Sequence, residues 1–219
     1  MNSREIIAKR VALEFKDGDV VNLGIGIPTL ACNYLPEGVH ITIHSENGML
    51  GMGPAALPGE ESNDVTDAGG NPVTIIPGGV FFDSATSFGL IRGGHVDETV
   101  LGALEVDQCG NLANWMIPGK KVPGMGGAMD LVTGARRVIV AMEHVNKDNS
   151  AKILGTCRLP LTAASKVNLI ITNMAVIEVK KEGGLILREL APDVTVEQVI
   201  AGTDAPLEIA PDLKVMPIQ

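Results

Sequence analysis

The chain has 219 residues, of which 45% are hydrophobic and 20% charged, a balance that allows a full-sized core and excludes an intrinsically disordered chain. The formal net charge is −9 at pH 7, which argues against nucleic-acid binding, because that function needs a basic face. The length suits a single domain spanning residues 1–219. There are 26 glycines where average usage would give about 15, so tight turns and close backbone approaches are expected.

The cysteines and the N-terminal segment indicate a cytoplasmic protein. Cys32, Cys109 and Cys157 are widely spaced and form no C-x-x-C motif, so reduced thiols are expected and not a disulfide framework. The first residues have a helical pattern and no basic-then-apolar leader. No apolar run approaches the roughly 20 residues of a membrane span, so we expect no membrane association.

The hydrophobic pattern predicts alternating helices and strands. A first helix begins at Asn2 or Ser3, presents one apolar face and ends at 17–18 (DG). A short helix runs through Tyr34, and another runs from Asp83 to about Arg92. Strands are predicted, in chain order, at 20–23, near 40–44, at 73–76, 98–104, 138–142 and 168–172. The stretch 54–72, rich in Pro, Gly, Asp and Asn, is predicted to be a long surface loop near Glu46.

The second half of the chain defines the fold class. Residues 138–142 and 168–172 are continuous apolar runs, typical of strands covered on both faces. Residues 175–180 and 185–190 flank a Glu-Gly-Gly turn and predict a hairpin. The segment 195–198 (TVEQ) matches a capping box for a last helix. The prediction is an α/β fold: a layered open sheet of mostly parallel strands with flanking helices and a C-terminal β-hairpin.

Glu46 is the first candidate for a functional residue. It lies in 45–48 (SENG), after residues 40–44, which alternate like a half-buried strand, and before 48–54, a glycine-rich stretch predicted to be a loop. In open α/β sheets, ligands bind at the carboxyl ends of the strands. The alternative interpretation of this tetrapeptide is an exposed turn glutamate.

Two glycine motifs are candidates for ligand-binding backbone. Residues 123–130 (PGMGGAMD) can aim several amide N–H groups at one anionic oxygen, as an oxyanion hole does, or can form a plain turn. Gly24 and Gly26 resemble the start of a dinucleotide fingerprint, but its third glycine and acidic partner are missing, so no nicotinamide site is expected. No P-loop occurs, because 119–121 reads GKK.

The histidines show no metal-ligand spacing, and structural roles are expected for all four. They are His40, His44, His95 and His144. No metal site is predicted.

Six sequence blocks occur together in a defined order. They are 21–28 (VNLGIGIP), 45–48 (SENG), 82–84 (FDS), 91–95 (IRGGH), 111–115 (NLANW) and 124–132 (GMGGAMDLV). In this order and spacing they resemble the B (beta) subunit of family I CoA-transferases, most closely the short-chain and 3-oxoacid enzymes of bacteria. The resemblance covers nearly the whole chain and thins out after about residue 190.

The resemblance implies an activity and a partner. Glu46 would attack an acyl-CoA and carry CoA as a glutamyl thioester in a ping-pong reaction with a free acid. The oxyanion or substrate loop would comprise Asn47, Gly124, Gly126 and Gly127, with Gly24 and Gly26 as further substrate contacts. No cofactor is implied, since coenzyme A is a substrate. An A (alpha) subunit would complete an α2β2 enzyme that exchanges acetate, acetoacetate or butyrate, in short-chain fatty acid and ketone body metabolism.

Two functions of other kinds stay open from the residues alone. A sugar-phosphate isomerase on a related architecture would use Glu46 as a general base and would need a phosphate site in the same chain. A regulatory binding module would keep the fold and use the pocket as a sensor. The intact segments 45–48 and 124–127 favour an enzyme over a sensor.

Overall fold

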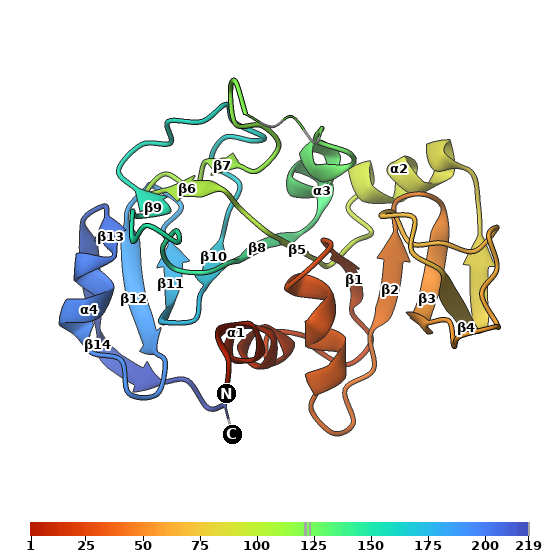
Figure 1. Ribbon diagram of the computed structural model, residues 1–219, viewed down its shortest axis with the longest axis horizontal. Coiled ribbons are helices and arrows are strands. Elements are labelled where there is room, and N and C mark those ends of the chain that lie inside the picture. The colour runs from red at the N-terminus through yellow and green to blue at the C-terminus, as the bar shows by residue number, and fades with distance from the viewer. Residues whose placement is uncertain (121, 123, 219) are drawn as a thin grey trace.

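The computed structural model describes residues 1–120, 122 and 124–218, and a ten-stranded mixed sheet organises them (Figure 1). The strands of this sheet are β1 (Val20–Leu23), β2 (Thr42–Ser45), β3 (Met49–Ala55), β4 (Val73–Phe81), β5 (Glu98–Leu101), β8 (Arg137–Ala141), β10 (Leu169–Ile171), β11 (Ala175–Val179), β12 (Leu185–Leu190) and β14 (Leu207–Val215). Their order in space is β14-β12-β11-β10-β8-β5-β1-β2-β3-β4.

The middle of the sheet is parallel and its flanks are mixed. Strands β2, β1, β5, β8 and β10 are parallel neighbours. The pairs β2–β3 and β3–β4 at one end, and β10–β11 and β11–β12 at the other, are antiparallel. This arrangement confirms the predicted α/β fold with mostly parallel central strands and a C-terminal hairpin formed by β11 and β12.

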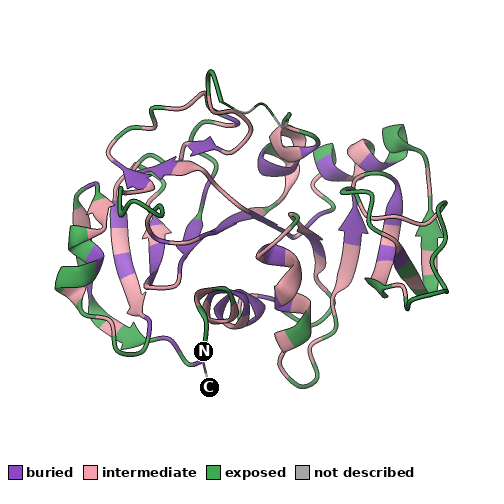
Figure 2. Cartoon of the chain, in the orientation of Figure 1, coloured by how far each residue is buried: buried purple, intermediate pink, exposed green. Residues whose placement is uncertain are grey.

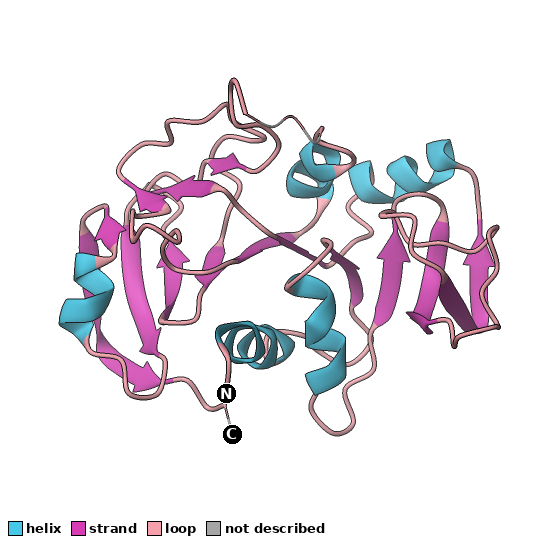
Figure 3. Ribbon diagram, viewed as in Figure 1, coloured by secondary structure: helices cyan, strands magenta, loops and turns pink. Residues whose placement is uncertain are grey.

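Helices lie on both sides of the parallel strands, as Figure 3 shows in cyan. They are α1 (Ser3–Ala12), the 3₁₀ helix η1 (Pro28–Tyr34), α2 (Ser84–Arg92), α3 (Ala128–Gly134) and α4 (Val196–Ala201). A smaller sheet has the order β13-β9-β6-β7, formed by β6 (Glu105–Asp107), β7 (Leu112–Ala113), β9 (Ile153–Leu154) and β13 (Thr203–Asp204).

The core has two halves because alternate side chains of the central strands point to opposite faces. In β8, Ile139 packs in a cluster with α1 residues such as Ile7, whereas Val138 packs with Leu131 of α3 and Ile91 of α2. Figure 2 shows this burial concentrated in the central strands. Both faces are covered, which explains the continuous apolar runs in the sequence.

The helices α1, α2 and α4 begin with side-chain caps. Asn2 and Glu5 form a reciprocal capping box at α1, and Thr195 and Gln198 form the predicted one at α4. The Asp83 side chain accepts from the Thr86 amide at the start of α2. No helix in the described part of the chain is long and apolar enough to cross a membrane.

Several of the predicted boundaries are wrong. The first helix ends at Ala12 and not at 17–18, and the strand predicted at 73–76 continues to Phe81. Residues 48–54 are not a loop, because 49–55 form strand β3, which pairs with β2 and β4. The glycines of this strand allow a close approach to β4: a Cβ on Gly51 would lie 2.9 Å from the Gly79 Cα. The strand predicted at 98–104 ends at Leu101, and a separate strand, β6, follows. The predicted surface loop is observed between β3 and β4.

Candidate active site

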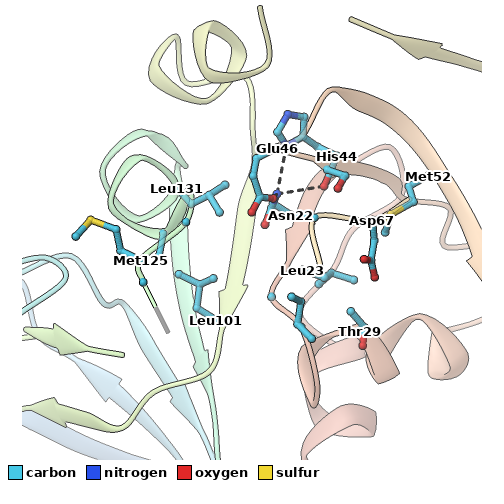
Figure 4. A pocket seen from close by; sticks show the side chains of 18 residues that line it. Asn22, Leu23, Thr29, His44, Glu46, Met52, Asp67, Leu101, Met125 and Leu131 are labelled. Atoms are coloured by element: carbon cyan, nitrogen blue, oxygen red, sulfur yellow. Dashed lines mark hydrogen bonds between the residues drawn. The ribbon is translucent and has the colours of Figure 1, made fainter. Parts of the chain in front are cut away.

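Glu46 is the first residue after β2, in the three-residue turn that leads into β3. The neighbouring parallel strand β1 carries Asn22, which pairs in register with His44 of β2. Parallel strands deliver their carboxyl ends to one edge of the sheet. The side-chain amide of Asn22 and the carboxylate of Glu46 therefore meet there, with Nδ2 donating to Oε2 at 3.0 Å (Figure 4).

Asn22 is buried, with 2% of its surface exposed. Its amide nitrogen has a further acceptor besides the Glu46 carboxylate. Nδ2 also lies 3.2 Å from the carbonyl oxygen of His44. A primary amide has two N–H groups, so one can donate to that carbonyl and the other to Glu46. The Glu46 carboxylate is thereby held by a donor fixed on the adjacent strand.

The side chain of His44 packs beside the same edge of the sheet. Its ring is buried, lies 2.9 Å through Nε2 from the Ser87 hydroxyl of α2, and stacks on Phe82 at a centroid distance of 6.3 Å. Burial lowers the pKa of His44, and the negative charge of Glu46 partly opposes that shift. A neutral imidazole at this position leaves Glu46 as the charged group of the cluster.

The glycine segment 124–127 lies against the other side of Glu46. A Cβ added to Gly127 would lie 2.9 Å from the Glu46 Cγ, so only glycine leaves room for the carboxylate stem. Gly124 and Gly126 have φ angles of 86° and 49°, a region that favours glycine. Helix α3 begins directly after Gly127. The segment predicted to be an oxyanion or substrate loop thus lies beside Glu46. Pro123, the first residue of the motif, lies outside the described residues.

A cavity of about 360 Å³ opens beside Glu46 between these elements. Its wall includes Asn22, Gly24, His44, Glu46, Asp67 and the segment 124–128. Figure 4 shows Met125 and Leu131 on one side of Glu46, and Met52, Asp67 and Thr29 on the other. The volume is typical of pockets that enclose small molecules.

The remaining sequence-based candidates take different positions. Gly24 lines the cavity, and a Cβ on it would lie 3.2 Å from the Val100 carbonyl oxygen. Gly26 has a φ of 106° and is outside the set of lining residues, as is Asn47. The Asn47 side chain instead donates to the Thr66 carbonyl at 2.7 Å, which ties the loop between β3 and β4 to the turn that carries Glu46.

Sequence reasoning missed Asn22 and Asp67 and assigned His44 a structural role only. A signal existed for Asn22, since it is a polar residue inside the apolar strand 20–23. His44 does have structural partners, yet it also lines the cavity. No sequence pattern singles out Asp67, because it lies in an irregular loop. Among the described residues, no cluster of His, Cys, Asp and Glu has the geometry to hold a metal ion.

Comparison with known proteins shows the family of this chain. The family model described as Coenzyme A transferase matches residues 4–202. The beta subunit of acetate CoA-transferase from Haemophilus influenzae is 57% identical, with 100% of this chain and 97% of that protein covered. The B subunit of a probable succinyl-CoA:3-ketoacid coenzyme A transferase from Bacillus subtilis is 50% identical over 95% and 96% of the two chains. A solved acyl-CoA transferase apoenzyme from Escherichia coli O157:H7 superposes with a TM-score of 0.78 at 25% identity, covering 98% of this chain and 43% of that one.

The chain therefore belongs to the coenzyme A transferase family. Within that family it is of the B (beta) type, as its full-length similarity to the beta and B subunits from two bacteria shows.

Proposed function

We propose that this chain is the subunit that carries the catalytic glutamate of an acetate- or 3-oxoacid-type CoA-transferase. It moves CoA between a short-chain acyl-CoA or 3-oxoacyl-CoA and a free carboxylic acid, with Glu46 as the CoA carrier. The observation that carries the proposal is the setting of Glu46: a carboxylate held by the Asn22 amide, facing a cavity and enclosed by a glycine segment.

The first half-reaction loads CoA on the enzyme. An oxygen of the Glu46 carboxylate attacks the thioester carbonyl, the C–S bond breaks, and a mixed acyl-glutamyl anhydride and CoA thiolate form. The thiolate then attacks the glutamyl carbonyl, which releases the first acid as its carboxylate and leaves CoA bound to Glu46 as a thioester. Attack by a weak carboxylate nucleophile becomes feasible because binding makes it intramolecular in effect.

The second half-reaction reverses these steps with another acid. Its carboxylate attacks the glutamyl thioester and expels CoA thiolate, and the thiolate attacks the new acyl carbonyl of the anhydride. The products are the new acyl-CoA and the free Glu46 carboxylate. One thioester replaces another, so the reaction needs no ATP, metal or redox cofactor.

Two sets of donors are available for the oxyanions of these steps. The Asn22 amide already binds Glu46 Oε2 and can follow that oxygen when the glutamyl carbonyl becomes tetrahedral. The backbone amides of Gly126 and Gly127, on the opposite side of Glu46, can serve the acyl carbonyl. This division assigns one oxyanion to a strand side chain and the other to the glycine segment.

An A (alpha) subunit is the proposed partner, in an α2β2 assembly. The net charge of −9 opposes a polyanion such as the nucleotide end of CoA, so a second chain is expected to supply that binding surface. The names of the similar beta and B subunits support such a partner.

The proposal is tested by the kinetics of Glu46 variants of this chain, co-expressed with the A subunit. Glu46→Asp withdraws the carboxylate by one methylene and should lower kcat by several orders of magnitude, because attack geometry tolerates little displacement. Glu46→Gln should abolish ping-pong turnover. Near-normal turnover by either variant would show that Glu46 is not the carrier. Glu61→Gln, an exposed acid of the loop between β3 and β4, is the control and should leave kcat unchanged.

A further inference from the structure

A second cavity, of about 460 Å³, adjoins the one beside Glu46. The two cavities share four lining residues: Leu23, Thr29, Met52 and Asp67. All four lie on the same side of Glu46 in Figure 4, away from Met125 and Leu131. The second cavity is therefore an extension of the active-site cavity and leads away from the glycine segment.

The walls of this extension are mainly apolar and come from strands β1 to β4, the helix η1 and the loop between β3 and β4. Ile43 of β2, Met52 of β3, and Val73 and Ile76 of β4 face it together with Cys32 of η1. Burial raises the pKa of the Cys32 thiol to about 11, so this side chain is a neutral, weakly polar wall. Such a lining suits a hydrocarbon chain.

Asp67 stands where the two cavities join, and its partners in the described chain are neutral. Its carboxylate accepts from the amides of Gly69 and Asn71, both at 2.8 Å, and from the Asn71 side chain. Neither cavity has a Lys or Arg among its described lining residues. Asp67 thus places a carboxylate at the junction of the two cavities, and Glu46 places another in the first cavity.

We propose that the second cavity is the acyl-chain subsite of the enzyme, and that Asp67 excludes acyl groups that carry a second carboxylate. This inference rests on the proposed function, in which the thioester carbonyl lies at Glu46. The two substituents of that carbonyl must leave it in different directions. The extension accepts the uncharged acyl chain, and the pantetheine arm leaves past the glycine segment.

The physical chemistry sets the expected selectivity. Each methylene buried in an apolar site is worth about 0.8 kcal/mol, or roughly a fourfold gain in kcat/KM. We expect kcat/KM to rise from acetyl-CoA to butyryl-CoA as the chain enters the extension. A terminal carboxylate, as in succinyl-CoA, would lose its hydration among apolar walls and lie close to Asp67, so it should be rejected.

The first experiment introduces larger side chains into the wall of the second cavity, in this chain co-expressed with the A subunit. Cys32→Phe narrows it from η1, and Ile76→Trp narrows it from the exposed strand β4 with less risk to folding. Either variant should retain kcat/KM for acetyl-CoA within about threefold and lose at least tenfold for butyryl-CoA. Ile200→Trp, at an exposed apolar position of α4 outside both sets of lining residues, is the control.

The outcomes of that experiment are distinct. An equal loss for acetyl-CoA and butyryl-CoA would mean that the pantetheine arm occupies the extension, and an unchanged ratio in both variants would mean that nothing does. Each result overturns the proposal. A failure of every acyl-CoA to load CoA on Glu46 in the unmodified enzyme would instead refute the proposed function itself.

The second experiment removes the charge of Asp67. Asp67→Asn keeps an acceptor oxygen for the Gly69 and Asn71 amides. It should raise kcat/KM for succinyl-CoA at least tenfold relative to butyryl-CoA. The control Asp64→Asn removes the same charge from an exposed position of the same loop and should not change this ratio. An unchanged ratio in Asp67→Asn, or an equal change in both variants, would show that Asp67 does not select against the second carboxylate.

Discussion

At the scale of the residue, the site depends on how one carboxylate is held. Glu46 is half-buried, one of its oxygens accepts from Asn22, and its stem packs where a Gly127 side chain would otherwise be. A nucleophile fixed on both sides keeps its direction of attack between the two half-reactions. Asn22 is the partner whose contribution can be measured separately, because its side chain rather than its backbone makes the contact.

Asn22→Ala is predicted to lower kcat by roughly 10²- to 10³-fold, the effect of losing one oxyanion donor. The same change should cost about 1–3 kcal/mol of stability, because a buried acceptor at the His44 carbonyl loses a donor. Steady-state kinetics and denaturant unfolding of the assembled enzyme measure the two effects separately. Normal turnover in a folded Asn22→Ala enzyme would assign the amide a purely structural role.

At the scale of the element, the parallel strands could be predicted and the glycine-containing strand could not. The strands β1, β8 and β10 and the hairpin β11–β12 have strong apolar patterns that match their burial. Strand β3 contains Gly51 and Gly53, and it forms through its pairing with β4. Its sequence alone therefore predicts a loop. Strands of two residues, such as β7 and β9, are too short to show a period.

The site could be predicted only in part for a related reason. Glu46 and the glycine segment stand out in the sequence, but their contact joins a turn after β2 to the start of α3. Asn22 and Asp67 reach the cavity only because parallel pairing and a loop tied by Asn47 bring them there. The sheet topology, and not any local motif, assembles these groups.

Gly127→Ala tests this contact between elements. The φ angle of Gly127 is −82°, which alanine adopts readily, so any effect arises from the added methyl pressing on the Glu46 stem. We predict a loss of at least about tenfold in kcat, with roughly 10²- to 10³-fold for Gly127→Val. Gly102→Ala is the control, since a Cβ there meets nothing within 4 Å. Equal kcat values for Gly127→Ala and Gly102→Ala would contradict the assigned contact.

At the scale of the whole molecule, the chain presents apolar side chains at one end of the sheet. Val80 and Phe81 of the edge strand β4 are 50% and 56% exposed. Ile25, which lines the cavity beside Glu46, and Leu57, in the loop after β3, are exposed too. Figure 2 shows exposed residues along this edge. Exposed apolar side chains and an unpaired strand edge are features that partner subunits often cover.

The isolated chain is predicted to be folded and inactive, and activity should appear only with an A-type subunit. The expected assembly contains two copies of each chain. Size-exclusion chromatography with light scattering, combined with transferase assays of the single chain and of the co-expressed pair, measures both properties. Full transferase activity of the isolated chain would contradict the two-subunit enzyme.

The most direct measurement of the central claim is the mass of the peptide that contains Glu46. The co-expressed enzyme is mixed with acyl-CoA in the absence of an acceptor acid, digested, and analysed by mass spectrometry. We predict that this peptide gains the mass of CoA with loss of water, and that borohydride reduces the thioester and prevents the gain. CoA attached to any other residue, or an unmodified Glu46 peptide in an enzyme that turns over normally, would contradict it.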